Sequence, residues 1–120
     1  MSTTQTADLY RYNAKVTDVY DGDSFTCDID LGFGVCLRGQ KVRVARINTA
    51  EIRGGTAETK AAARVARDRV KLLILDQTVR LRTDKDKGKF GRWVAEVTTP
   101  DGDNLSDLLL DEGLAKIYGA

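Results

Sequence analysis

Apolar and polar residues alternate along the first third of the chain, and this period of two predicts extended strands. Residues 24–31 place four apolar side chains on one face: Phe25, Cys27, Ile29 and Leu31. The same reading predicts five strands, at residues 12–20, 24–31, 35–47, 78–81 and 91–98. Turns containing glycine separate the first three, which predicts an antiparallel meander. In the first of these turns we expect Gly22 to supply a positive φ.

Between the third and fourth strands the period changes to that of a helix, at residues 57–75. Its predicted buried stripe comprises Ala62, Val65, Ala66, Val70 and Leu73, and Thr56 is placed to cap its first turn. A second, shorter helix is predicted to begin at a cap on Ser106 and to end at Gly113. Five short strands with a helix after the third favour an α+β, mainly β fold: a five-stranded OB-fold β-barrel with two to three helices.

The length of 120 residues fits one domain, which we place at residues 11–120 after a flexible tail at residues 1–10. No apolar stretch approaches the roughly 20 residues that span a bilayer. The N-terminus also lacks the basic and apolar segments of a secretion signal. We therefore expect an intracellular monomer that does not contact membranes.

The absence of histidine narrows the chemistry more than any other count. It excludes zinc sites built on histidine, Ser-His-Asp triads and histidine general bases. Two cysteines, Cys27 and Cys36, are too few for a disulfide scaffold. They lie equally far from a turn centred at residues 31–32, so they either face each other across two strands or serve as two small core residues.

Carboxylates and arginines remain as candidates. Asp23 beside a glycine turn and Glu51 in a loop, with Asn48 and Thr49 nearby, offer oxygen ligands to a hard cation such as calcium or magnesium. Arg43 and Arg92 lie in or at the mouth of strands. The planar guanidinium group binds phosphate through two parallel hydrogen bonds.

The net charge is only +1, so a nucleic acid would need a local basic patch. Two segments could provide this patch: Arg43, Arg46 and Arg53 in one, and Lys85, Lys87, Lys89 and Arg92 in the other.

Three motifs in order make a specific combination. Asp21-Gly22-Asp23-Ser24-Phe25, the segment from Arg43 to Glu51, and Lys89-Phe90-Gly91-Arg92 resemble the three active-site motifs of the staphylococcal nuclease (thermonuclease) family. The resemblance covers nearly the whole chain. It implies an OB barrel that is a calcium-dependent nuclease acting on DNA, RNA or both with little sequence specificity.

The resemblance also implies roles for individual residues. Asp23, Asn48 and Thr49 match metal-ligand positions, and Glu51 matches the general base. Arg43 and Arg92 match the arginines that hold the scissile phosphate. Lys89, Phe90 and Tyr118 match positions that bind the substrate.

One departure bears on the metal, because Asn48 stands where the family usually has an aspartate. The substitution removes one negative charge, so we expect weaker calcium affinity or a changed metal preference. The alternative function is a non-catalytic OB-fold module that binds single-stranded nucleic acid. The presence of both arginines and both carboxylates favours the nuclease.

Overall fold

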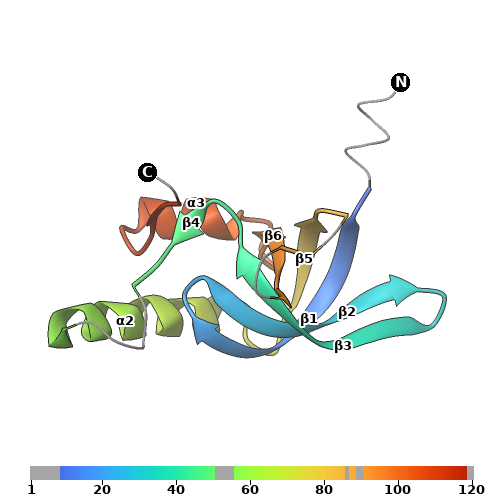
Figure 1. Cartoon of the computed structure of the whole chain (residues 1–120), viewed down its shortest axis with the longest axis horizontal. Helices are drawn as coiled ribbons and strands as arrows, with labels where there is room; N and C mark the ends of the chain where they lie inside the picture. The colour runs from blue at the N-terminus through green and yellow to red at the C-terminus, as the bar shows by residue number, and fades with distance from the viewer. Residues whose placement is uncertain (1–8, 51–55, 86, 89–90, 119–120) are drawn as a thin grey trace, which may run out of the picture.

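A computed structural model describes residues 9–50, 56–85, 87–88 and 91–118. Five strands close into a barrel in the order β1-β2-β3-β6-β5, with β5 pairing back on β1 (Figure 1). These strands are β1 (Arg11–Asp21), β2 (Ser24–Gly32), β3 (Val35–Val44), β5 (Thr78–Thr83) and β6 (Trp93–Thr98). The predicted mainly β barrel of OB type is therefore confirmed. Of the predicted tail at residues 1–10, all but Leu9 and Tyr10 lies outside the described residues.

The barrel interior is filled by the inward-facing side chains of its strands. Val16, Cys27, Val42, Leu81 and Val97 each expose none of their surface. All pairings are antiparallel except that of β3 with β6, which is parallel over Val42–Val44. This parallel pairing joins segments about fifty residues apart, so the end of β3 lies beside the start of β6.

The predicted strand at residues 35–47 ends earlier than expected, at Val44. Arg46 then takes a left-handed conformation with φ +72°, which turns the chain out of the barrel. A two-residue strand follows, β4 (Ile47–Asn48), and pairs antiparallel with β7 (Lys116–Ile117) near the C-terminus.

Helix α2 (Ala57–Ile74) begins at the predicted cap, Thr56, in a capping box in which the side chains of Thr56 and Thr59 accept from each other's backbone N–H groups. Its buried residues are Ala63, Ala66, Val70 and Ile74. The predicted stripe was thus wrong at Ala62 and Val65, which are exposed. Alanines occupy three successive positions, Ala61 to Ala63, so periodicity alone did not identify the inward-facing one.

Helix α3 (Leu105–Asp111) packs against β6, and its Leu105 and Leu109 are fully buried. The predicted cap at Ser106 was wrong, because the Asn104 side chain accepts from the backbone N–H of Asp107. Ser106 is buried instead, and its hydroxyl donates to the carbonyl of Ala45 over 2.7 Å. The helix ends as predicted, with Gly113 in the left-handed region.

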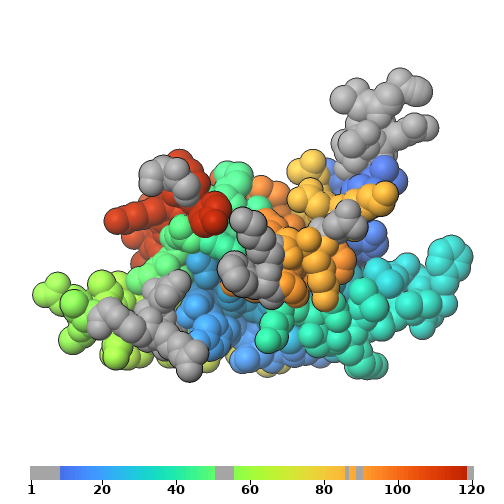
Figure 2. All heavy atoms as spheres, in the orientation of Figure 1, coloured from blue at the N-terminus to red at the C-terminus, as the bar shows by residue number. Residues whose placement is uncertain are grey.

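The β2–β3 hairpin extends beyond the barrel as an arm, visible on the right of Figure 2. Its tip exposes Phe33 fully. Register shifts in the hairpin place Cys36 opposite Asp30, and Cys27 opposite Gln40. Both cysteines are free, with Cys27 buried and Cys36 exposed. They therefore do not face each other, and the interpretation as core residues is confirmed for Cys27 but was wrong for Cys36.

Neither described helix combines the length and apolar character needed to cross a membrane.

Candidate functional site

The turn between β1 and β2 holds Asp23 at one end of the barrel. The Asp23 backbone carbonyl accepts from the N–H of Val44 over 2.8 Å, which ties the turn to the end of β3. Its carboxylate accepts from the backbone N–H of Thr49 over 3.2 Å. The first two motifs, more than twenty residues apart in sequence, thus meet through hydrogen bonds made by one aspartate.

Arg43 lies beside this aspartate, opposite Ser24 in the β2–β3 register. Its guanidinium lies 3.7 Å from the Asp23 carboxylate, and the two side chains are only 15% and 13% exposed. It also donates to the carbonyl of Ile47 over 3.0 Å and to the side-chain oxygen of Asn48. These contacts hold the cationic group in one orientation, so little conformational freedom remains to be lost on binding an anion.

Tyr118 lies over the same guanidinium, with 4.7 Å between the Arg43 Cζ atom and the centre of the ring. Its backbone N–H donates to the carbonyl of Arg46 over 2.8 Å, continuing the pairing of β4 with β7. The side chain is largely exposed. One face of an aromatic ring is thus stacked on a cation at the edge of the site.

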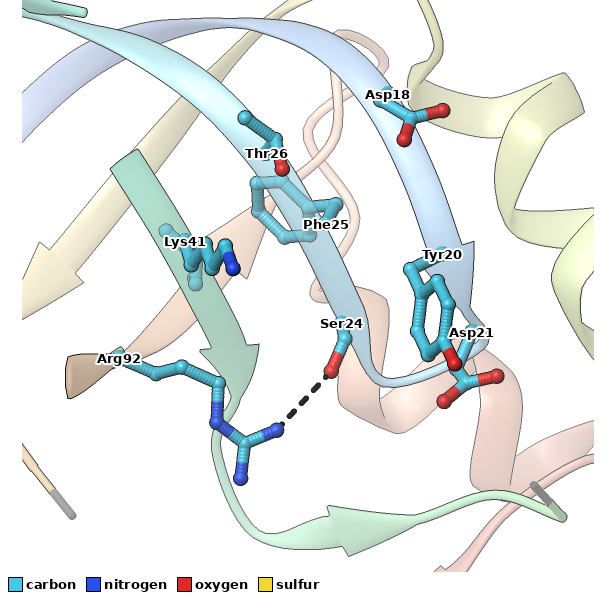
Figure 3. A pocket seen from close by; sticks show the side chains of 9 residues that line it. Asp18, Tyr20, Asp21, Ser24, Phe25, Thr26, Lys41 and Arg92 are labelled. Carbon is cyan, nitrogen blue, oxygen red and sulfur yellow. Dashed lines mark hydrogen bonds between the residues drawn. The ribbon is translucent and has the colours of Figure 1, made fainter. Parts of the chain in front are cut away.

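Arg92 reaches the site from the residue before β6 and donates to the hydroxyl of Ser24 over 3.3 Å (Figure 3). It lines two hollows in the surface. One, of about 240 Å³, also has Arg43 and Tyr118 in its wall. The other, of about 530 Å³, lies over the outer face of β1, β2 and β3. The two arginines singled out from the sequence therefore face a common hollow.

The sequence grouped Arg46 with the basic lining, and the structure pairs its charge elsewhere. Its guanidinium contacts Glu96 at 2.8 Å and Asp107 at 3.1 Å. The hydrogen bonds that Arg46 donates to both carboxylates raise its pKa. Arg46 therefore fixes the turn after β3 and adds little positive charge to the site.

The described residues bring together six of the nine predicted site residues: Asp23, Arg43, Asn48, Thr49, Arg92 and Tyr118. Glu51, Lys89 and Phe90 lie outside the described residues, as does Arg53. Ser24 was missed as a partner of Arg92, although its place in the first motif was a signal.

The oxygen donors near the β1–β2 turn suit a hard cation. Asp21 is buried, and the hydroxyl of Thr49 is buried without a hydrogen-bond partner among the described residues. That part of the chain contains no cluster of three or more carboxylates and thiols of the kind that could hold a metal by themselves. A cation here would therefore rely on neutral oxygens such as those of Asn48 and Thr49.

A closed five-stranded barrel, with two guanidinium groups that face one hollow, defines a domain of OB type. Comparison with protein-family models agrees: residues 41–120 match the model described as staphylococcal nuclease homologue. The chain belongs to this family, which is of nuclease type. No curated protein matches the chain.

Proposed function

We propose that the chain is a metal-dependent nuclease that hydrolyses phosphodiester bonds of DNA, RNA or both with little sequence specificity. One observation carries the proposal: Arg43 and Arg92, from distant parts of the chain, line the same hollow beside the Asp23 carboxylate. We further propose that residues 11–120 act as one domain and as a monomer.

In this proposal the two arginines bind the non-bridging oxygens of the scissile phosphate. Attack on phosphorus places additional negative charge on these oxygens, so the guanidinium groups stabilise the transition state more than the ground state. The bonds from Arg43 to the Ile47 carbonyl and the Asn48 side chain support this role, because they orient the group before substrate arrives.

We assign proton transfer to Glu51, two residues after Thr49, as the general base that accepts a proton from the attacking water. A base must lie within hydrogen-bond reach of that water. The expectation for Glu51 comes from its motif, since the residue lies outside the described part of the chain.

Calcium is the proposed cofactor, held by Asp23, Asn48 and Thr49. The donor set fits because every candidate ligand is an oxygen, and because the partnerless Thr49 hydroxyl lies in a buried position. When bound, the ion would supply positive charge against the charge developing on the phosphate. Asn48 contributes no negative charge, so affinity should be weaker than with two aspartates.

Low sequence specificity follows from the kind of contacts available. Arginines recognise phosphate, and an aromatic ring such as Tyr118 accepts any base by stacking. Lys89 and Phe90 are proposed to contact the neighbouring phosphate and sugar.

The test is cleavage of plasmid DNA and of single-stranded RNA by the purified chain, with calcium or with EDTA. We expect cleavage only with the metal. Arg92→Lys should lower the rate by about 10²–10³ because a lysine cannot reproduce the bidentate contact. Arg64→Lys, on the exposed face of α2, is the matched control and should cleave at the wild-type rate.

Cleavage that persists in EDTA, or equal rates for Arg92→Lys and Arg64→Lys, would contradict the proposal. Absence of cleavage with calcium, magnesium and manganese, together with retained oligonucleotide binding, would identify the alternative, a non-catalytic binding module.

A further inference from the structure

The larger of the two hollows that share Arg92 has no role in the proposed chemistry. It lies on the outer surface of β1, β2 and β3 (Figure 3), and Tyr118 lines only the smaller hollow. A polynucleotide whose phosphate is held by Arg92 must continue in both directions from it. The larger hollow lies along one of these directions.

One wall of this hollow is cationic. Lys41 is exposed and forms no ion pair within the described part of the chain, and Arg92 lies beside it in Figure 3. Lys41 pairs with Thr26 and Arg43 pairs with Ser24, so both cations project from the same outer face of β3. Two residues along a strand span about 6.6 Å, close to the separation of successive phosphates in an extended polynucleotide.

The opposite wall carries an aromatic ring. Tyr20, near the end of β1, is 53% exposed and lines the hollow. Figure 3 shows Asp18, Tyr20 and Asp21 on the side of β2 away from Lys41 and Arg92. Carboxylates repel phosphate, so this wall suits a base and excludes the backbone. One wall is thus suited to the phosphate of a nucleotide, and the opposite wall is suited to its base.

We propose that this hollow binds the nucleotide next to the scissile phosphate, with its base stacked on Tyr20 and its phosphate on Lys41. The inference rests on the proposed function only in taking Arg92 to hold the scissile phosphate. A single strand of either DNA or RNA supplies the required base and phosphate, because neither contact involves the sugar hydroxyl.

Binding of labelled single strands in EDTA, measured by fluorescence anisotropy, tests the site without requiring cleavage. Tyr20→Ala should weaken binding of an eight-nucleotide strand about tenfold, the effect of losing one base stack. Lys41→Gln should reduce the slope of log affinity against log salt by about 0.7. A nucleoside 3′,5′-bisphosphate has no neighbouring nucleotide to place in the larger hollow, so it should bind both variants with wild-type affinity.

Matched controls separate stacking from loss of structure. Tyr20→Phe keeps the ring and should bind the eight-nucleotide strand as the wild type does. Phe33→Ala at the hairpin tip and Lys60→Gln on α2 remove an exposed ring and an exposed charge outside the hollow. Both should leave affinity and salt dependence unchanged. Parallel measurements with DNA and RNA strands identify which polymer the site prefers.

Wild-type affinity for the eight-nucleotide strand in both Tyr20→Ala and Lys41→Gln overturns the inference, as does an equal loss for the bisphosphate. These outcomes are distinct from failure of the proposed function. A chain that cleaves nothing yet needs Tyr20 and Lys41 for strand binding would refute the nuclease and retain the site. A chain that cleaves, but binds strands equally well without Tyr20 and Lys41, would support the nuclease and refute the site.

Discussion

Gly22 is needed for space rather than for backbone freedom. It is absent from the described glycines with positive φ, contrary to the expectation from its turn motif. A Cβ atom at this position would lie 2.9 Å from the Thr49 Cγ2 atom and 3.0 Å from the Ala66 Cβ atom. The glycine thus lets the aspartate turn, the Thr49 segment and helix α2 approach one another closely.

Gly22→Ala should therefore destabilise the fold by about 1–3 kcal/mol through overpacking. The free energy of unfolding in urea measures this, and adding Thr49→Ala should recover part of the loss because it removes two of the three close atoms.

Gly34→Ala is the control for this experiment. Gly34 has open space around it but a φ of +73°, so its substitution costs backbone strain that Thr49→Ala cannot relieve. Strictly additive effects of Gly22→Ala and Thr49→Ala would show that the two positions do not press on each other.

At the scale of single residues, the sequence identified candidate chemical groups better than it identified their partners. Arg43, Arg92 and Asp23 were found from their motifs, and their side chains do gather. The pairing of Arg46 with Glu96 and Asp107 was missed, because those carboxylates lie fifty or more residues away. Ion pairs of this kind depend on how elements pack, and no local pattern encodes them.

Among the elements, the turn after β3 positions the site. Arg46 in this turn contacts Glu96 on β6 and Asp107 on α3, while the Ser106 hydroxyl holds the carbonyl of Ala45. The turn that leads to Asn48 and Thr49 is therefore fastened to two other elements.

This network should make stability depend on acidity. Burial raises the pKa of the Glu96 carboxyl. Hydrogen bonds from Arg46 and Asn104 together lower this pKa by more than burial raises it, so the net pKa lies below its ordinary value. A lowered folded-state pKa gives stabilisation that is present above the unfolded-state value of about 4.3 and is lost as the pH falls through the folded-state pKa.

We predict that Glu96→Gln lowers the free energy of unfolding at pH 7 by on the order of 1 kcal/mol. Its deficit relative to the wild type should shrink as the pH is lowered below about 4, since the wild-type carboxyl is then protonated as well. Urea unfolding between pH 7 and 3 measures both effects, with Asp101→Asn in the exposed turn after β6 as the control. A deficit that stays constant with pH would mean that the Glu96 charge contributes nothing.

Strand and helix positions were largely predictable from periodicity, and the exceptions have local causes. The predicted strand at residues 35–47 was too long because Arg46 adopts a positive φ. Non-glycine residues rarely adopt this conformation, so an arginine in the sequence gives no indication of it. The cap of α3 moved from Ser106 to Asn104 because Ser106 is drawn into the packing against the Ala45 carbonyl.

For the molecule as a whole, barrel closure depends on two long-range pairings, β1 with β5 and β3 with β6. An alternating pattern predicts a strand but not the strand with which it pairs. The prediction of a barrel therefore rested on the order of the elements and on the resemblance to a known family. The parallel β3–β6 pairing matters most for the site, because it brings the end of β3 with Arg43 close to Arg92.

Cys27 offers a measure of how often this barrel opens. Its side chain is fully buried, and burial, with smaller effects from Asp28 and Cys36, raises the pKa of its thiol to about 12. Thiol reagents act on the thiolate, so Cys27 should be inert in the folded protein. The exposed Cys36 should react readily.

We expect a thiol-specific chromogenic reagent to titrate one cysteine in the native protein and two in denaturant. In Cys36→Ala, the only remaining thiol should be labelled at the rate at which the barrel opens. Rapid labelling of this variant under native conditions would show that the core is accessible without unfolding.

The hydrogen bonds that Arg43 makes to the Ile47 carbonyl and the Asn48 side chain have a consequence for the second motif. The Arg43 side chain folds back on the segment that follows it, up to Asn48. The number of residues in this segment is therefore limited by the distance that the arginine side chain can span. The group at the far end can be an amide or a carboxylate, because either accepts the same hydrogen bond. Chain length is therefore the stricter requirement in this motif, and residue identity at position 48 the looser one.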